Sequence, residues 1–335
     1  MTGQKKSTIT EKDLPTLAIV VPCFNEAETI KHSTKILLKT LSEMIEKKEV
    51  SLKSYILFVD DGSHDETWFL ISEEHKTDSK VKGISLSRNF GHQHALMSGL
   101  QQIKDKCDIS ISIDADLQQD PKAMSKFIAE YNNGADIVFG IREKTKNTSF
   151  LKRSASALFY KLLTLMKAEI IPDHADYRLL SNRAVSALTL HKEPNLFLRG
   201  LCLKLGFKTS TVKHTVFDRE YGTTKYSVKK MLSLALNGVT TLTIFPLRAI
   251  ALVGLLCFAA TLIMGAYVLW HTIITGNTVP GWASTTLPIY FIGGIQLLAL
   301  GIFGEYLGKI YLTVQNRPRW IISNQIGIDI ETQQT

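Results

Sequence analysis

The sequence predicts an α/β domain followed by two membrane-spanning helices. Short apolar segments alternate with helical patterns from Thr16 to Arg142, which is typical of a βαβ sheet with helices on both faces. Between Arg248 and Glu305 the chain has no Lys, Arg, Asp or Glu, and its apolar runs are long enough to cross about 30 Å of hydrocarbon as helices. A chain of 335 residues has room for both parts.

The apolar segments predict strands at residues 16–21, 55–59, 81–87, 109–113 and 136–141. Asn25 is expected to cap the helix after the first strand, with Glu28 in the capping-box position. Asp120 and Pro121 are expected to begin the helix after the fourth strand. Polar residues at these strand ends are therefore expected to share one edge of the sheet.

The charge and the cysteines narrow the class of protein. The formal net charge is +8, which suits anionic lipid or phosphorylated substrates. Nucleic acid is not expected as a partner, because no basic run is interleaved with aromatic residues. The four cysteines are scattered and are expected to be reduced. The N-terminal residues have no apolar core, so no signal peptide is expected.

Asp114 and Asp116 follow the Ile109–Ile113 strand with i, i+2 spacing. Carboxylate oxygens with no Cys or His nearby suit Mg²⁺ or Mn²⁺, which take one or two protein carboxylates and complete their shell with water and phosphate oxygens. A solvated turn is the alternative for this pair. The residues further along the chain favour the metal site.

Other polar clusters follow the remaining strands. Asp60 and Asp61 start a Gly-Ser turn that suits either ordinary turn chemistry or hydrogen bonds to a nucleobase and ribose. The helix that begins after Asn25 offers free amides to a phosphate. His92 and His94 lie at i, i+2, point to different helical faces and are expected to be structural.

The apolar runs predict two crossings with both chain ends on the cytoplasmic side. Lys and Arg flank the pair of runs, whereas the short segment 271–286 between them has none. Residues 227–245 predict an amphipathic stretch on the bilayer surface, and residues 315–322 predict a basic and aromatic interfacial anchor. Glu305 is expected to pair with Lys309 one helical turn later.

The assembled motifs resemble the polyprenyl-phosphate glycosyltransferases of glycosyltransferase family two, which include dolichol-phosphate mannose synthase and undecaprenyl-phosphate glucosyltransferases. The resemblance runs from about residue 16 to residue 322 and rests on the segments 21–26, 59–63, 88–93, 114–118, 140–142, 176–179, 219–226, 304–311 and 316–318. It implies a GT-A fold, a UDP- or GDP-linked sugar donor, a divalent metal and inversion at the anomeric carbon. It also implies that Asp60 and Asp61 meet the base and ribose.

The chain departs from the family pattern at two places. Residues 143–146 read Glu-Lys-Thr-Lys where the family often has a second arginine, so the basic partner of Arg142 stays open. His174 and Ala175 replace the more usual small and polar residues before Asp176, which leaves the role of that loop open.

The site residues expected from the motifs and the resemblance fall into overlapping groups. The catalytic candidates are Asp116, Gln118, Asp176 and Arg142. The nucleotide-sugar candidates are Pro22, Asn25, Glu26, Asp60, Asp61, Arg88, Asp114 and Lys225. The acceptor-phosphate candidates are Arg142, Lys152, Arg153, Arg178 and Arg219, and the metal candidates are Asp114 and Asp116.

A phosphate acceptor needs no strong general base, because its second pKa of about 6 leaves it largely dianionic at neutral pH. Asp176 is expected either to position the reactants or to help with proton transfer. A salt bridge to Arg178 is the plain structural alternative for Asp176.

These expectations predict inverting transfer of a sugar, from UDP-glucose or a related UDP-sugar, to undecaprenyl phosphate at the cytoplasmic face of the inner membrane for cell-envelope glycan modification. The alternatives are mannosyl transfer from GDP-mannose, a processive polysaccharide synthase, and a non-catalytic membrane scaffold. A separate flippase and a downstream transferase are expected as partners, and a homo-oligomer is possible. The expected parts are a polar tail (1–14), the catalytic domain (15–226), interfacial helices (227–247), a membrane hairpin (248–314, crossing at about 249–270 and 287–310) and a cytoplasmic tail (315–335).

Overall fold

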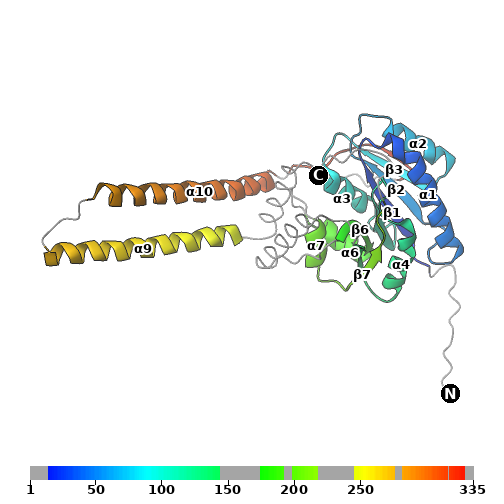
Figure 1. The fold of residues 1–335 in the computed structure, drawn as a ribbon. Coiled ribbons are helices and arrows are strands. Elements are labelled where there is room, and N and C mark those ends of the chain that lie inside the picture. The colour runs from blue at the N-terminus through cyan, green and yellow to red at the C-terminus, as the bar shows by residue number, and fades with distance from the viewer. Residues whose placement is uncertain are drawn as a thin grey trace, which may run out of the picture. The chain divides into compact units, whose positions relative to one another are not determined.

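A computed structural model describes residues 14–143, 174–191, 198–217, 245–275, 281–315 and 317–328. The chain divides into two compact units, and each is described by itself. The first comprises residues 1–164, 169–225 and 318–335, and the second comprises residues 165–168 and 226–317. The sheet and its helices form the first unit, and two long helices, α9 and α10, form the second (Figure 1).

Within the described residues, the first unit is built on an eight-stranded sheet with the order β7-β5-β6-β4-β1-β2-β3-β8. Strands β4, β1, β2 and β3 are parallel neighbours, whereas β6 is antiparallel to β4 and β5, and β8 is antiparallel to β3. The sheet is therefore mixed. The strands are β1 Leu17–Cys23, β2 Tyr55–Asp60, β3 Val81–Leu86, β4 Ile109–Ser112, β5 Ile137–Arg142, β6 His174–Ser181, β7 Thr209–His214 and β8 Ile322–Ile326.

Helices cover both faces of the sheet, as the sequence predicted. Successive side chains of a strand point to opposite faces, so Leu17 and Ile19 of β1 join one core cluster while Ala18 and Val20 join the other. Side chains from α1, α2 and α4 complete the first cluster, and side chains from α3, α6 and α7 complete the second. These helices are α1 Ala27–Glu46, α2 Thr67–Thr77, α3 His92–Ile103, α4 Met124–Asn132, α6 Asn182–Thr189 and α7 Leu198–Lys204.

The predicted strands correspond to β1 to β5, with small shifts at their ends. The sequence analysis missed β6, β7 and β8. In β7, Thr-Ser-Thr-Val-Lys-His, only Val212 and His214 are buried, so the strand lacks an apolar run. In β6 the buried positions include Arg178, a residue that a hydrophobic pattern places on the surface.

One predicted helix cap is confirmed and one is wrong. The Asp120 carboxylate accepts the Lys122 N–H at 3.0 Å, and Pro121 opens the 3₁₀ turn η2, Pro121–Ala123, that leads into α4. Asn25, in contrast, does not cap α1, which begins at Ala27 without a side-chain cap. Asn25 has a φ of 52°, and its Oδ1 accepts the His64 N–H at 2.9 Å, so it joins two loops instead.

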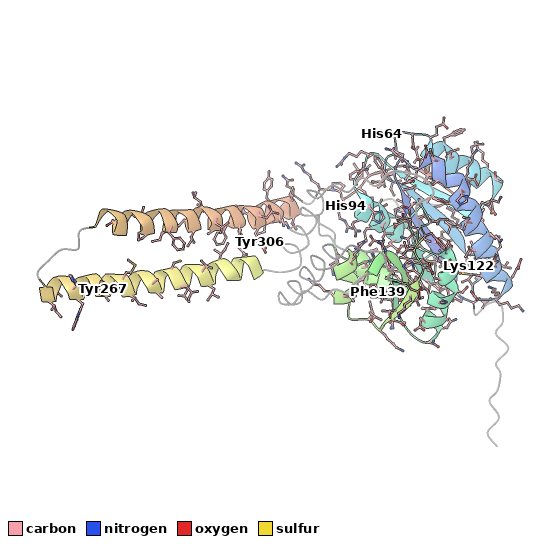
Figure 2. All side chains as sticks on the ribbon, in the orientation of Figure 1. His64, His94, Lys122, Phe139, Tyr267 and Tyr306 are labelled. Carbon is pink, nitrogen blue, oxygen red and sulfur yellow. The ribbon has the colours of Figure 1, made fainter. Side chains whose placement is uncertain are left out.

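The second unit contains two long apolar helices in contact with each other, α9 Phe245–Thr275 and α10 Trp282–Val314. Tyr267 lies on α9 and Tyr306 on α10 (Figure 2). Among the described residues, the segment Phe291–Val314 is long and apolar enough to cross a membrane. The predicted two-helix hairpin stays a prediction. The predicted pair of Glu305 and Lys309 is present, with Oε1 and Nζ 3.7 Å apart.

The segment after α10 corrects the expectation of an interfacial anchor. Residues 315–335 were expected to form a cytoplasmic tail that begins with an interfacial anchor. Instead, the Trp320 side chain is buried in the second core cluster of the first unit, and β8 extends the sheet beside β3. The aromatic residue of the expected anchor is therefore a core residue of the first unit.

The packing of α3 on the sheet predicts a stability effect at Gly99. A Cβ at Gly99 would lie 2.7 Å from Cγ2 of Val59 and 2.8 Å from Cγ1 of Val20. Gly99→Val is therefore expected to lower the free energy of unfolding by about 1–3 kcal/mol through overpacking, measured by urea denaturation. Gln101→Val, which introduces the same side chain on the same helix, is the control, with an expected change within about 0.5 kcal/mol. Equal effects at the two positions would contradict the packing account.

Candidate functional site

Most of the predicted site residues meet at one edge of the sheet. The parallel strands β4, β1, β2 and β3 end at this edge, and β5 ends there too, because β4 and β5 are both antiparallel to β6. Crevices at the carboxyl ends of strands are where open α/β sheets bind ligands. The predicted residues at or after these ends are Pro22, Asn25, Glu26, Asp60, Asp61, Arg88, Asp114, Asp116, Gln118 and Arg142.

Asp114 is held by a residue that the sequence analysis did not select. The buried Gln119 side chain donates from Nε2 to Oδ2 of Asp114, and its Oε1 accepts the Asp114 N–H at 3.4 Å. A backbone bridge ties Gln119 to Val216. The loop from Asp114 to Gln119 turns at Leu117, which has a φ of 46°. Gln119 therefore fixes the orientation of the Asp114 carboxylate. Its place immediately after the Asp-x-Asp-Leu-Gln motif could have identified it from the sequence as a site residue.

Asp116 and Gln118 lie in the same loop. The Asp116 Oδ1 accepts the Gln118 N–H at 3.4 Å, and the Gln118 carbonyl accepts the Phe217 N–H at 2.9 Å. Both side chains are partly exposed. The loop thus presents the second carboxylate to solvent while its backbone is anchored to the segment after β7.

His92 belongs to the site, so the expectation that it is only structural is corrected. Its Nε2 lies 3.8 Å from Oδ1 of Asp114 and 3.6 Å from Oδ2 of Asp176. Burial alone would lower the pKa of His92, but the nearby carboxylates of Asp176 and Asp114 outweigh it and raise the pKa above its usual value. His92 is the first residue of α3, which begins shortly after the carboxyl end of β3. This position in the chain could have identified His92 as a site residue.

Asp176 is surrounded by basic side chains. Arg178 donates to its Oδ1, and Arg199 donates from Nη2 to its Oδ2 at 3.1 Å. Burial alone would raise the pKa of Asp176, but His92, Arg178 and Arg199 together hold it well below its usual value. Asp176 is therefore an ionised carboxylate that organises neighbouring cations, and the expected salt bridge to Arg178 is present.

The assignment of Arg178 to an acceptor phosphate is corrected. Its side chain is 2% exposed, its Nη2 binds Asp176, and its Nη1 donates to Sγ of Cys202 at 3.4 Å. A guanidinium that is buried and bound in this way supports Asp176 and does not present its donors to a ligand. Arg199, with a side chain that is 38% exposed, is the more accessible cation of this cluster.

Asp60 and Asp61 are both buried, and each of their carboxylate oxygens accepts a hydrogen bond from the protein. Asp60 accepts the Ser63 N–H at 3.0 Å and the Ser85 hydroxyl at 2.9 Å. Asp61 accepts the N–H groups of Phe90 and Gly91 at 2.8 and 2.9 Å. Of the two alternatives for this pair, these bonds favour turn chemistry, because they join the turn after β2 to β3 and to the loop 88–91.

Gly62 allows the close approach of this turn to Arg88. It has a φ of 67°, and a Cβ there would lie 2.3 Å from the carbonyl carbon of Arg88, so only glycine fits. The Arg88 guanidinium is exposed and lies 4.0 Å from the ring centroid of Phe90. The loop 88–91 is thus fixed by Gly62 and Asp61 while the Arg88 side chain remains accessible.

Of the remaining predicted residues, two have structural contacts near the site, one is exposed, and four lie outside the residues that the structure describes. Pro22 lies within β1 opposite Val59. The Glu26 N–H donates to Oγ1 of Thr67 at 2.9 Å. Both residues therefore have a structural role at the edge of the sheet where the site lies. Arg142 is exposed at the end of β5. Four further candidates lie outside the described residues: Lys152, Arg153, Arg219 and Lys225.

Comparison with known proteins establishes the family. A family model described as glycosyl transferase family 2 matches residues 18–188, which include β1 to β6 and both carboxylates of the Asp114 loop. An uncharacterized glycosyltransferase of Bacillus subtilis is 41% identical over 320 residues, covering 96% of this chain and 94% of that protein. The chain belongs to glycosyltransferase family 2.

Two further similarities add detail. The bactoprenol glucosyl transferase of Shigella phage SfX is 36% identical over 310 residues, covering 92% of this family 2 chain and 99% of the phage protein. Among solved structures, the glucosyl-3-phosphoglycerate synthase of Mycobacterium tuberculosis overlaps with a TM-score of 0.42 at 16% identity, covering 72% of this chain and 85% of that one. Nothing about the donor or the metal follows from that distant overlap.

The residues of this glycosyltransferase fit a divalent cation held largely by non-protein oxygens. Within the described ranges, no three or more His, Cys, Asp or Glu side chains are grouped to hold a metal ion. Asp114, with a side chain that is 35% exposed, and Asp116 supply carboxylate oxygens in one loop. One or two carboxylates, completed by water and phosphate, suit Mg²⁺ or Mn²⁺ better than a cage of protein ligands.

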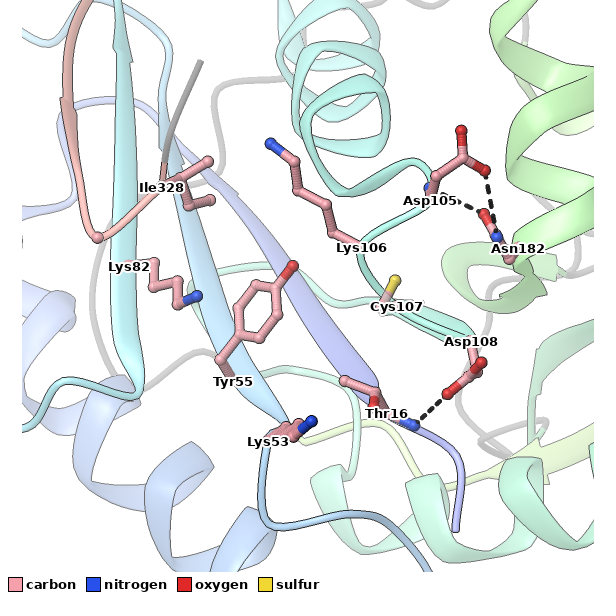
Figure 3. Close-up of a pocket in the computed structure, with 11 residues that line it drawn as sticks. Thr16, Lys53, Tyr55, Lys82, Asp105, Lys106, Cys107, Asp108, Asn182 and Ile328 are labelled. Atoms are coloured by element: carbon pink, nitrogen blue, oxygen red, sulfur yellow. Dashed lines mark hydrogen bonds between the residues drawn. The ribbon is translucent and has the colours of Figure 1, made fainter. Parts of the chain in front are cut away.

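A cavity of about 480 Å³ lies at the opposite edge of the sheet (Figure 3). Its lining includes Thr16, Tyr55 and Asp108, which lie at or before the amino ends of β1, β2 and β4. The Asp108 carboxylate accepts the Thr16 N–H at 2.7 Å. This cavity is therefore separate from the carboxyl-end site.

The two ion pairs of Asp176 are expected to differ in their contribution to stability, because Arg178 is buried and Arg199 is partly exposed. Asp176→Asn is expected to cost about 3–5 kcal/mol of unfolding free energy, because it leaves the buried Arg178 without its counter-charge. Arg199→Gln removes the half-exposed partner and is expected to cost less than about 1 kcal/mol. Urea denaturation of both variants at pH 7 measures the difference, and equal costs would contradict the assignment.

The same carboxylate predicts a pH dependence. The pKa of Asp176 is lower in the folded state than its value of about 3.9 in the unfolded state. The contribution of the ionised carboxylate to folding stability is therefore fully present above about pH 3.9 and is lost as the pH falls through the folded-state pKa. The stability difference between wild type and Asp176→Asn should therefore shrink as the pH is lowered below about 4. A difference that is constant between pH 7 and the acid limit of the folded state would contradict this sign.

Proposed function

We propose that this glycosyltransferase transfers glucose from UDP-glucose to a polyprenyl phosphate, with inversion at the anomeric carbon. The observation that carries the proposal is the extent of similarity to the bactoprenol glucosyl transferase of phage SfX, 36% identity over 92% of this chain. That coverage reaches beyond the family-matched residues 18–188, so it takes in residues of both units. A lipid-linked acceptor explains why a sugar-transfer domain is joined to two long apolar helices.

Asp114 and Asp116 are proposed to hold Mg²⁺ or Mn²⁺. The bound metal would neutralise charge on the leaving diphosphate. Gln119 keeps Asp114 oriented through two hydrogen bonds, as outer partners of metal ligands commonly do. Asp60 and Asp61 set the positions of the turn 60–63 and of the loop that bears Arg88, so their proposed contribution to nucleotide binding is indirect.

The acceptor phosphate needs cations more than it needs a base. With a second pKa of about 6, a phosphate monoester is largely dianionic at neutral pH and can attack without losing a proton to the protein. Asp176 suits positioning better than proton transfer, since its low pKa keeps it ionised. Arg142, which is exposed, and Arg199, which is partly exposed, are proposed to bind the phosphate, and Lys152, Arg153 and Arg219 stay candidates.

α9 and α10 are proposed to cross the inner membrane as a hairpin, with the catalytic unit and both chain ends in the cytoplasm. Both helices carry exposed apolar side chains along their length, an arrangement that is unfavourable in water and favourable in lipid. The exposed side chains include Leu255, Leu256, Ile263, Leu297, Leu298 and Phe303. A hairpin is too small to conduct a sugar, so a separate flippase and a downstream transferase are proposed to use the product.

Transfer of radiolabelled sugar into the organic phase tests this function. Purified protein with undecaprenyl phosphate and Mg²⁺ or Mn²⁺ is expected to label the lipid from UDP-glucose and not from GDP-mannose. Chelation of the metal should abolish the transfer, and Asp116→Asn should reduce it by at least about 100-fold, on the order of removing one electrostatic contact at a reacting centre. Full activity of Asp116→Asn with ordinary metal dependence would refute the metal assignment.

Gln119 supplies a second prediction for the same assay. Gln119→Ala removes the donor to Oδ2 of Asp114, and the apparent metal affinity is expected to fall about 10- to 100-fold. The change should appear as a higher Mg²⁺ or Mn²⁺ concentration for half-maximal transfer. Gln101→Ala makes the same chemical change on α3 and is the control, so it should leave the metal requirement unchanged. An unchanged requirement in Gln119→Ala would contradict the role given to Gln119.

A further inference from the structure

We propose that residues 320–326, which return to the sheet after α10, are a positioning element of the nucleotide-sugar site. The inference rests on the proposed function for the identity of the donor. The segment contains Trp320 and β8, and it reaches the site through hydrogen bonds that start on β3. It would therefore affect donor binding without touching the donor.

The first step is the pairing of β8 with the carboxyl-terminal half of β3. Ser85 lies opposite Asn324 and Leu86 lies opposite Ile322, with an irregularity between the two pairs. The Ser323 hydroxyl adds a hydrogen bond to the Ser85 carbonyl at 3.1 Å. The edge of β3 next to the site is therefore held by β8.

The second step leads from β3 to the turn after β2. The Ser85 hydroxyl donates to Oδ2 of Asp60 at 2.9 Å, and Oδ1 of Asp60 accepts the Ser63 N–H at 3.0 Å. The Ser63 hydroxyl in turn accepts the Asn25 N–H at 2.9 Å. Since Ser85 and Asp60 are buried, a shift of β3 would move both connected loops.

The third step leads to the loop 88–91. The Ser87 N–H donates to the Ile321 carbonyl at 2.9 Å, so the first residue after β3 is bound directly by the C-terminal segment. Asp61 then accepts the N–H groups of Phe90 and Gly91. His92, which faces Asp114 and Asp176, follows immediately. The loop is thus fixed from both sides, by Asp61 and by Ile321.

Trp320 anchors the end of the segment that is next to this loop. Its side chain is 2% exposed and belongs to the core cluster against which Phe90 and Ile322 pack. Ile328 belongs to the same cluster and is 9% exposed, but it follows the other end of β8 and lines the cavity at the amino ends of the strands. Comparing variants of Trp320 and Ile328 therefore distinguishes the effect of lost core packing from the effect of a displaced site loop.

The test compares Trp320→Ala with Ile328→Ala in the full-length protein. Both variants remove a buried side chain from one cluster, and both are expected to lower the unfolding free energy. Amide hydrogen exchange reports the opening of the Ser63, Ser87, Phe90 and Gly91 N–H bonds, and steady-state transfer gives kcat and the KM for UDP-glucose. Ser85→Ala is the milder variant, with Ser110→Ala as its matched control, because Ser110 is also buried in a strand and donates to the Leu180 carbonyl.

Trp320→Ala and Ser85→Ala are expected to speed exchange at these amides and to raise the KM for UDP-glucose by about 2- to 10-fold, the equivalent of one net hydrogen bond. The KM for polyprenyl phosphate should stay unchanged, and neither control should raise the KM for UDP-glucose. Unchanged exchange at Ser63 and Phe90 in both variants would overturn the proposal, as would equal KM increases in the controls. Wild-type protein that transfers no sugar would refute the proposed function instead, and the exchange comparison would still decide the positioning role.

Discussion

The parallel alignment of β4, β1, β2 and β3 is the constraint on which the candidate site depends. It brings the loops after four strands to one edge, and the antiparallel β6 adds Asp176 from the opposite chain direction. Carboxylates that are distant in sequence thereby become neighbours. His92 joins two of them, since its Nε2 lies within 4 Å of both Asp114 and Asp176.

Most of the buried polar groups at this edge support the loops of the candidate site. Asp61 accepts two backbone N–H groups, Asp176 organises two arginines, and Gln119 orients Asp114. Burying an ionised group is costly unless partners compensate it, so each of these groups is well partnered. Asp116 and Arg199 are partly exposed, which is compatible with the contacts proposed for them with the metal and the acceptor phosphate.

The sequence predicted the parts of the fold that follow from simple periodicity. The apolar strands β1 to β5, the helices on both faces and the Asp114 loop were all visible in it. The burial of Arg178 and Trp320 was not, because it depends on segments that meet only in the folded chain: Cys202 contacts Arg178, and the second core cluster encloses Trp320. Local sequence patterns place an arginine, and a tryptophan in a basic segment, at the surface of the protein. The i, i+2 spacing of His92 and His94 does not reveal the site role of His92, because that role depends on the position of α3 at the edge of the sheet.

The structure of the lipid product tests the central claim most directly. If the acceptor phosphate oxygen attacks the anomeric carbon as proposed, the product should be a polyprenyl monophosphate that carries one glucose with inverted anomeric configuration. Mass spectrometry of the product gives the number of phosphates and sugars, and proton NMR gives the configuration. A product with two phosphates, a product with a chain of sugars, or retention of configuration would contradict the account.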